Sequence, residues 1–168
     1  MFDVLAGLDV PWQHVRIWQV DERVAPDGDP DRNAGQLDRL PGRHRLMPVT
    51  AKDLAAACRR YARTLPERFD VVHLGVGDDG HTASWPPGDP VIDSADPVAL
   101  SGVYQGRVRM TLTPSVVNAA RGRVILTFGD GKAAALARWD GPVSRVKRTS
   151  TVVFTDRAGA GRLGGGVR

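Results

Sequence analysis

Residues 74–88, LGVGDDGHTASWPPG, place a histidine and two aspartates close to the glycines Gly75, Gly77 and Gly80. Histidine titrates near neutral pH, so His81 could take a proton from water as a general base. Asp79, two residues earlier, could hold the other ring nitrogen and raise the basicity of the imidazole. An exposed turn that carries a surface histidine fits the same residues. Spacing alone therefore leaves both interpretations open.

The glycines of this loop also match the dinucleotide-binding pattern G-x-G-x-x-G. That pattern requires the loop to open a helix whose N-terminus faces a pyrophosphate. Here Asp78 and Asp79 would face the anion, and Pro86-Pro87 leaves room for barely one turn of helix. We therefore reject a dinucleotide site. We expect the glycines to let the backbone turn sharply, so that His81 points into a crevice.

Three cations are candidate ligands for a phosphate group. Lys132 opens a predicted helix after a Gly-Asp-Gly turn, where its ammonium and the helix amides could share a phosphate. Arg109 lies on a predicted strand that leads into a helix. Arg23 ends the charged run Asp21-Glu22-Arg23, in which Arg23 could hold an anion while the two acids orient it or bind sugar hydroxyls. Each cation is equally consistent with a solvated surface charge.

Other classes of site have little support in the sequence. There is no C-x-x-C or H-x-x-x-H pattern for a metal and no G-x-S-x-G pattern for a serine hydrolase, and no cofactor is indicated. The 23 Lys and Arg residues outnumber the 19 Asp and Glu residues, but apart from RVKR at 145–148 they are scattered. This favours an anionic small molecule over nucleic acid as the partner.

The cellular setting is predicted from cysteine usage and hydropathy. Cys58 is the only cysteine, so no intrachain disulfide can form, and a reducing, cytoplasmic location is expected. No apolar run approaches the roughly 18 residues of a membrane span, and the first residues lack the pattern of a signal peptide. We expect no membrane association.

The elements that must position these residues alternate between apolar runs and helical stretches, which predicts an α/β fold with a mainly parallel sheet flanked by helices. Thr50 is expected to cap the clearest helix, with Asp53 in a capping-box position and Cys58 buried. The strand at 69–77 is expected to be buried on both faces, with His73 in the core or an interface. The predicted strands cover 15–20, 69–77, 107–113, 123–128 and 150–155, and the predicted helices cover 49–65, a segment from Pro114, 131–139 and a short segment from about Asn33.

Ligands of parallel α/β sheets bind beyond the carboxyl ends of the strands. Three polar clusters follow predicted strands: residues 21–23, residues 75–84 and residues 129–132. We therefore expect one composite site. A length of 168 residues suits a single domain, 1–168, with a flexible glycine-rich tail at about 158–168.

Taken together, the motifs resemble those of bacterial 6-phosphogluconolactonases over roughly residues 15–160. They occur in the family's order: VDER, Asn33, LGVGDDGHTAS, RMTLTPSVVNAA, GKAAAL and FTDRAGA. The resemblance implies the Rossmann-like sugar-phosphate isomerase fold shared with glucosamine-6-phosphate deaminases. It also implies a cytoplasmic carboxylic ester hydrolase of the pentose phosphate pathway, which hydrolyses 6-phosphoglucono-1,5-lactone without a metal or another cofactor.

The resemblance also implies roles for individual residues. His81 would activate water for attack on the lactone carbonyl, Asp79 would orient His81, and Gly77 would supply backbone near the substrate. The remaining residues would bind the substrate: Arg109 and Lys132 would hold its phosphate, and Arg23 would lie close to the sugar.

The beginning of the chain departs from the family pattern. Family members carry another strand and helices ahead of VDER, including a loop similar to SGGSTP that wraps the phosphate. Here only a few residues precede PWQHVRIWQV. We expect either an N-terminally shortened form, lacking the first strand-helix units, or a divergent member that has lost part of its site.

Two alternative functions stay open at this point. A glucosamine-6-phosphate deaminase has phenylalanine, asparagine, glutamate and proline after its D-G-H, where this chain has TASWPP. Because the glutamate that assists ring opening is missing, the sequence favours a lactonase. The second alternative is a non-catalytic remnant that binds a sugar phosphate or has no function.

Overall fold

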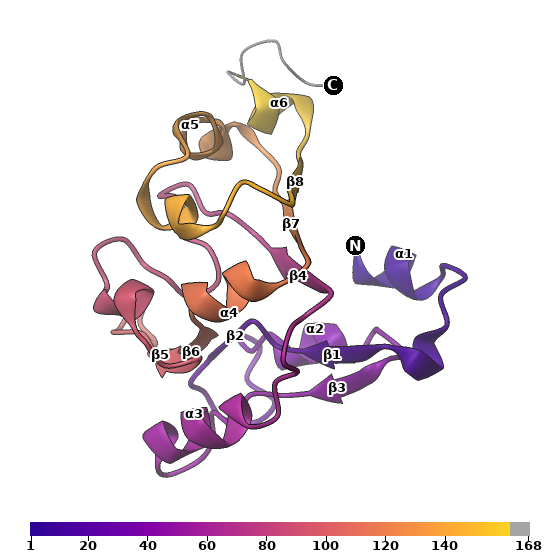
Figure 1. The fold of residues 1–168 in the computed structure, drawn as a ribbon, viewed down its shortest axis with the longest axis vertical. Coiled ribbons are helices and arrows are strands. Elements are labelled where there is room, and N and C mark those ends of the chain that lie inside the picture. Colours follow the sequence, from indigo (N-terminus) through magenta and orange to yellow (C-terminus); the bar gives the residue numbers. More distant parts are fainter. Residues whose placement is uncertain (162–168) are drawn as a thin grey trace.

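The structure is a computed structural model that describes residues 1–161 (Figure 1). Most of the predicted glycine-rich tail, residues 162–168, lies outside the described residues. The first residues of that predicted tail are helical, because Arg157–Ala160 form helix α6. The side chain of Asp156 caps this helix by accepting a hydrogen bond from the amide of Gly159, at 2.8 Å.

The described strands form three small sheets. The first two are a parallel pair, β1 (Arg16–Trp18) with β3 (Arg43–Arg45), and an antiparallel sheet in the order β2 (Asp21–Arg23), β6 (Arg109–Leu112), β5 (Val98–Leu100). The third is a parallel sheet in the order β4 (Val71–Leu74), β7 (Gly122–Leu126), β8 (Thr151–Phe154). The α/β prediction with mainly parallel strand pairing is confirmed, although the predicted strand at 107–113 belongs to the antiparallel sheet.

Short helices flank these sheets. In Figure 1, α5 and α6 lie with β8 at one end of the molecule, and α3 lies at the other. Residues 1–18, which include α1 and β1, project as an arm beside β4. The helices are α1 (Phe2–Ala6), α2 (Ala34–Leu37), α3 (Leu54–Ala62), α4 (Pro114–Ala119), α5 (Ala133–Arg138) and α6. Among the described residues, no helix has the length and apolar character needed to cross a membrane.

Helix α3 begins later than the sequence predicted. Its N-cap is Asp53, whose side chain accepts a hydrogen bond from the amide of Ala56 at 2.8 Å. The predicted cap at Thr50 is therefore wrong, because the carboxylate closer to the apolar stripe satisfies the free amides of the first turn. Cys58 is buried as predicted, next to Ala57 and Tyr61 on the packed face of the helix.

The parallel sheet is buried on only one of its faces. Val72 and Leu74 of β4 are buried, whereas Val71 and His73, which alternate with them, are exposed. The prediction that this strand is buried on both faces is therefore wrong for the described residues, and His73 does not lie in the core. The same exposed face includes Val152 and Phe154 of β8.

The first predicted strand, 15–20, is also shorter in the structure. β1 ends at Trp18. The side chain of Gln19 accepts a hydrogen bond from the amide of Met47 at 2.6 Å, and the chain then passes from the first sheet into the second. The charged run that was expected to follow the strand instead forms β2. In β2, Arg23 lies opposite Arg109 of β6, so two candidate phosphate ligands become cross-strand neighbours.

Glu22, the middle residue of this charged run, is fully buried. Its Oε1 accepts hydrogen bonds from the amides of Arg23 at 2.9 Å and Asn33 at 2.7 Å. Its Oε2 accepts from the amide of Ala34 at 2.9 Å, the side-chain amide of Gln19 at 2.8 Å and the guanidinium of Arg32 at 3.4 Å. Glu22 thus fastens the 19–34 segment and is not available to bind sugar hydroxyls.

Replacing Glu22 with glutamine is expected to destabilise the protein. The glutamine amide has one acceptor oxygen in place of two, and the buried Arg32 loses one of its two carboxylate partners, keeping only Asp27. We expect the free energy of unfolding to fall by about 2–4 kcal/mol, measured by urea denaturation. The matched control is Asp93→Asn, which removes an exposed ion pair with Arg145 and should change stability by less than about 1 kcal/mol. Equal effects of the two variants would contradict the structural role of Glu22.

Candidate active site

The loop after β4 folds into a tight turn that its glycines make possible. The amide of Gly77 donates to the carbonyl oxygen of His81 at 2.9 Å, and the amide of Gly80 donates to the carbonyl oxygen of Gly77 at 3.0 Å. Gly80 has a φ of +79°, a conformation that side chains disfavour. Thr82 closes the turn by donating its hydroxyl to the carbonyl oxygen of Gly75 at 2.7 Å. The sharp turn predicted for this loop is present.

His81 and Asp79 are in direct contact within the turn. Nδ1 of His81 lies 2.6 Å from Oδ1 of Asp79, which also accepts the backbone amide of His81 at 3.1 Å. Burial opposes ionisation of Asp79, but hydrogen bonds from Tyr104 and His81 outweigh it and lower the pKa of the carboxyl to about 2. Because an ionised carboxylate only accepts hydrogen bonds, neutral His81 carries its proton on Nδ1 and has a lone pair on Nε2. This is the arrangement of a general base.

Gly77 provides the room for the imidazole ring. A Cβ atom at this position would lie 2.2 Å from both Nδ1 and Cε1 of His81. Glycine is needed at position 77 for the space it leaves and not for its backbone conformation, because Gly77 does not have the positive φ found at Gly80. The sequence-based prediction that Gly77 supplies backbone near a substrate stays a prediction, and its amide is already used by the carbonyl oxygen of His81.

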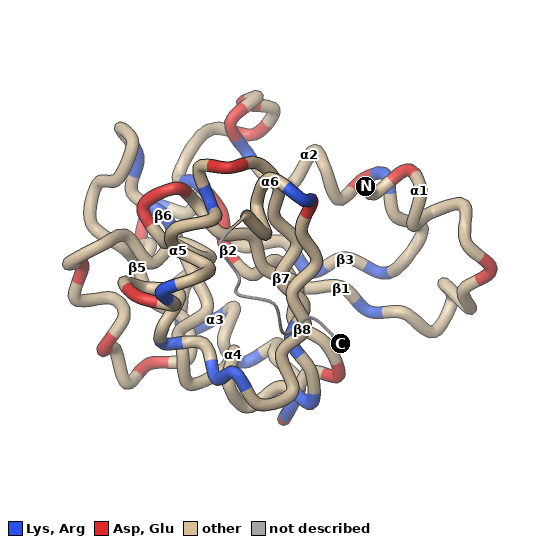
Figure 2. The backbone as a smooth tube through the Cα atoms, turned by 90° about the horizontal axis from the view of Figure 1, so that it is seen from above, with Lys and Arg blue, Asp and Glu red and all other residues tan. Residues whose placement is uncertain are grey.

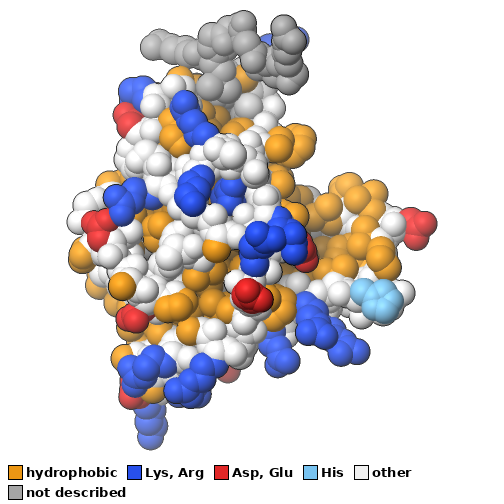
Figure 3. All heavy atoms as spheres, in the orientation of Figure 1, with side chains coloured by type: hydrophobic (Ala, Val, Ile, Leu, Met, Phe, Trp, Pro, Cys, Tyr) orange, Lys and Arg blue, Asp and Glu red, His pale blue; other side chains and the backbone are white. Residues whose placement is uncertain are grey.

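One large cavity, of about 1620 Å³, brings most of the predicted site residues together. His81, Gly77, Arg23 and Arg109 all line it. The exposed face of the parallel sheet and the arm formed by residues 1–18 contribute much of the remaining wall. In Figure 3 this arm carries many hydrophobic side chains. Of the three clusters expected to form one composite site, residues 21–23 and 75–84 contribute to this cavity together with Arg109 of β6, whereas residues 129–132 do not line it.

The two arginines in this cavity create a positive region. Arg23 is held by hydrogen bonds to the side chain of Asn33 at 2.7 Å and the carbonyl oxygen of Asp31 at 2.8 Å. Arg109 is 4% exposed, and burial together with the charge of Arg23 lowers the pKa of its guanidinium. Nη2 of Arg109 donates to Gln105 at 2.9 Å, but its buried Nε has no hydrogen-bond partner among residues 1–161. A bound anion would relieve both the repulsion and the missing hydrogen bond.

Asp21 connects β2 with the histidine loop. The hydroxyl of Ser84 donates to Oδ2 of Asp21 at 2.6 Å. Burial raises the pKa of Asp21, and the hydrogen bond from Ser84 and the charges of Arg23 and Arg109 only partly offset that effect. Asp21 is thus hydrogen-bonded to the loop that carries the base and is near enough to both arginines for their charges to act on it.

The structure places Lys132 apart from the other predicted residues. It ends the 3₁₀ turn Asp130–Lys132 ahead of α5, and its ammonium pairs with the carboxylate of Asp78. Lys132 is not among the residues that line the large cavity. Asp78 also packs against the backbone of Gly131, because a Cβ there would lie 2.8 Å from Oδ1 of Asp78. The Lys132–Asp78 pair thus ties the histidine loop to α5.

Sequence reasoning missed Tyr104, whose hydroxyl donates to Oδ2 of Asp79 at 2.7 Å. The segment SGVYQGRV carries no catalytic motif. Its only signal is a single aromatic residue in a glycine-containing turn just ahead of Arg109, which was too weak to indicate a contact with a loop 25 residues away.

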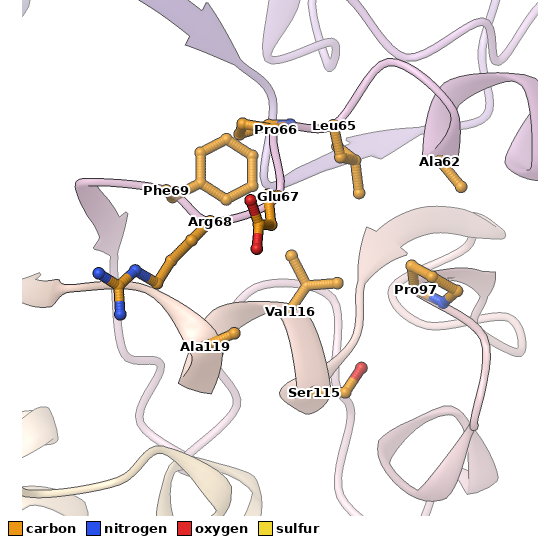
Figure 4. A pocket seen from close by; sticks show the side chains of 10 residues that line it. All are labelled: Ala62, Leu65, Pro66, Glu67, Arg68, Phe69, Pro97, Ser115, Val116 and Ala119. Atoms are coloured by element: carbon orange, nitrogen blue, oxygen red, sulfur yellow. The ribbon is translucent and has the colours of Figure 1, made fainter.

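Other surfaces show less chemical specialisation. A second pocket, of about 290 Å³, lies between the end of α3 and α4 and contains none of the predicted site residues (Figure 4). Lys and Arg residues are spread over many elements rather than gathered on one of them (Figure 2). Within residues 1–161, no group of three or more histidine, cysteine, aspartate or glutamate side chains is placed to hold a metal ion.

Comparison with known proteins decides the family. The sequence model described as glucosamine-6-phosphate isomerases/6-phosphogluconolactonase matches residues 1–155. The chain belongs to this family. Among its curated relatives are the 6-phosphogluconolactonase of Synechocystis sp., 30% identical with 81% of this chain and 64% of the relative covered, and that of Streptomyces coelicolor, 33% identical with 76% and 59% covered. The chain thus spans about three fifths of the length of these curated relatives.

Solved structures confirm the fold of this family member. The 6-phosphogluconolactonase of Thermotoga maritima superposes with a TM-score of 0.81 at 21% identity, covering 92% of this chain and 78% of that one. A monomeric glucosamine-6-phosphate deaminase superposes with a TM-score of 0.77, also at 21% identity, covering 89% and 76%. The sugar-phosphate isomerase-like fold expected from the motifs is confirmed.

Gly77→Ala is expected to displace the imidazole of His81, because the added methyl group would occupy the position of the ring. The backbone conformation at position 77 accepts alanine, so the fold should be retained. We expect the imidazole NMR resonances of His81 to shift and any histidine-dependent turnover to fall about a hundredfold. Gly75→Ala is the matched control, since its Cβ would meet no atom closer than 4.0 Å. A Gly77→Ala protein with unchanged His81 resonances would contradict this packing.

Proposed function

We propose that this protein hydrolyses 6-phospho-D-glucono-1,5-lactone to 6-phospho-D-gluconate, as a cytoplasmic enzyme of the pentose phosphate pathway. The observation that carries the proposal is the shared cavity. It holds a histidine whose Nε2 makes no hydrogen bond within residues 1–161 and a buried arginine whose Nε has no partner in the same part of the chain. Family membership and the names of the curated relatives support the same reaction.

In the proposed reaction, His81 is the general base. Its Nε2 removes a proton from water, and the water oxygen attacks the lactone carbonyl carbon to form a tetrahedral oxyanion. The bond between that carbon and the ring oxygen then breaks, and the proton on Nε2 passes to the departing oxygen. Ionised Asp79 keeps the Nδ1 proton in place and stabilises the imidazolium between the two transfers.

The phosphate of the substrate is proposed to bind at the arginines of the cavity. Nε of Arg109 has no hydrogen-bond partner among the residues that the structure describes, and Arg23 lies opposite Arg109 across the β2–β6 pair. A guanidinium matches the geometry of phosphate oxygens and keeps its charge at all physiological pH values. Lys132 stays a predicted additional ligand, and it would have to exchange Asp78 for the phosphate.

Two competing functions are separable by direct assays. An isomerase-deaminase would release ammonia from glucosamine 6-phosphate and leave the lactone untouched. A non-catalytic binder would bind 6-phosphogluconate in calorimetry without turning over the lactone, and a remnant without function would do neither. We expect lactone hydrolysis above the spontaneous rate and no ammonia release.

His81→Ala is expected to lower kcat for lactone hydrolysis by about 10²–10⁴-fold, because the reaction loses its base. The circular dichroism spectrum and the urea unfolding midpoint should stay close to wild type, since the ring is partly exposed and lies in a surface loop. The matched control is His44→Ala, a histidine that does not line the cavity and should retain wild-type turnover. Wild-type-like turnover in His81→Ala would refute the assignment of the base.

Arg109→Gln is expected to weaken binding of 6-phosphogluconate at least about tenfold, because a charge-assisted phosphate contact is lost. Isothermal titration calorimetry measures this directly, and salt should weaken the wild-type protein more than the variant. Arg145→Gln, at an exposed arginine paired with Asp93, is the control and should bind like wild type. If Arg109→Gln binds as tightly as the control, the phosphate site is elsewhere.

A further inference from the structure

Both oxygens of the Asp79 carboxylate are engaged. Oδ1 lies 2.6 Å from Nδ1 of His81, and Oδ2 accepts the hydroxyl of Tyr104 at 2.7 Å. We propose that Tyr104 is a positioning residue that fixes the Asp79 carboxylate and, through it, the imidazole of His81. The proposal rests on the proposed function, because it gives Tyr104 a part in the proton transfer assigned to His81.

The direction of each hydrogen bond in this trio is determined by charge. Burial and the neighbouring carboxylate raise the pKa of Tyr104 to about 12, so its hydroxyl keeps its proton at neutral pH. Since ionised Asp79 has no proton to donate, Tyr104 is the donor to Oδ2. The oxygen of Tyr104 lies 3.1 Å from Nδ1 of His81, where it can only accept. All these contacts favour the form of His81 with its lone pair on Nε2.

Tyr104 also lies between the base and the positive region of the cavity. Its ring meets that of His81 edge to face, with centroids 5.2 Å apart. On the other side, Cζ of Arg109 lies 5.0 Å from the centre of the Tyr104 ring. Gln105 strengthens this connection, because its side chain accepts from Arg109 at 2.9 Å and lies 3.4 Å from the hydroxyl of Tyr104. One side chain thus contacts both the proton-transfer pair and the proposed phosphate ligand.

The turn that carries Tyr104 is anchored at both ends. The backbones of Tyr104 and Arg107 exchange hydrogen bonds of 2.9 and 3.2 Å. Between them, Gln105 and Gly106 have φ values of +51° and +78°, as in the two-residue hairpin turns that match strand twist. Arg107 then pairs with Asp29 at 3.0 Å and Asp31 at 3.1 Å. The loop that carries Asp29 and Asp31 also binds Arg23, through the carbonyl oxygen of Asp31. The turn therefore holds Tyr104 at a fixed position relative to Arg23 and Arg109.

Tyr104→Phe tests the proposal because it removes only the hydroxyl and keeps both ring contacts. We expect kcat for lactone hydrolysis to fall about ten- to a hundredfold, less than for loss of the base itself, with KM changed less than about threefold. We also expect the NMR titration of His81 to change, because the hydroxyl that is removed donates to its partner Asp79 and lies within hydrogen-bond distance of its own Nδ1.

A control and a second variant keep this test decisive. Val103→Ala changes an exposed side chain next to Tyr104 and should leave kcat and the His81 titration unchanged. Tyr104→Leu, which also removes the ring, should lower kcat further than Tyr104→Phe. Wild-type kcat together with an unchanged His81 titration in Tyr104→Phe would overturn the proposal. A rise in KM alone would also overturn it, because Tyr104 would then act in substrate binding only.

Failure of the proposed function gives a different result. If the wild-type protein does not hydrolyse the lactone, the reaction is wrong, but the NMR titration still decides whether Tyr104 acts on His81 through Asp79. A titration that moves in Tyr104→Phe supports the coupling without turnover. A titration that does not move refutes the coupling whatever the reaction.

Discussion

The buried carboxylate of Glu22 organises the part of the chain from which one wall of the cavity is built. Its two oxygens accept hydrogen bonds from residues between 19 and 34, so a loop rich in proline and aspartate takes one conformation. A carboxylate with this many donors is stable inside a protein where an unpaired one would not be. Asp21 and Arg23, which flank Glu22 on β2, both line the cavity. The buried Glu22 thus fixes the strand, and its neighbours Asp21 and Arg23 present their charges to the cavity.

The arginines and the Asp79–His81 pair of the site lie on different elements. Arg23 and Arg109 face each other across β2 and β6, and Asp79 with His81 occupies the loop after β4. Ser84 and Tyr104 provide the connections between these regions, to Asp21 and Asp79 respectively. A sugar phosphate is complementary to this arrangement, with a dianion at one end to meet the arginines and a reactive carbonyl at the other to meet the histidine. The arrangement can therefore orient such a molecule by electrostatics before any specific contact with its hydroxyl groups is made.

The sequence was informative where local chemistry determines structure. The apolar runs of β4 and β7, the stripe of α3 and the glycine turn before His81 all follow from periodicity or backbone freedom. Strands β3 and β5 could not be predicted in this way, because three residues such as RHR or VAL carry no period of their own and pair only once their partner strands exist. The burial of Glu22 and the contact of Tyr104 with Asp79 were missed for the same reason. Both depend on segments that approach only in the folded chain.

The close packing of the His81 ring on Gly77 has a consequence for how this loop can change in evolution. No side chain fits at position 77 while the ring is in place, because a Cβ there would lie 2.2 Å from two of its atoms. Position 77 is therefore not free to vary while His81 is present, whereas His81 can change without any change at Gly77. Loss of the histidine would remove the steric restriction on the glycine as well, so changes in this loop have an order: the ring must go before a side chain can enter at position 77.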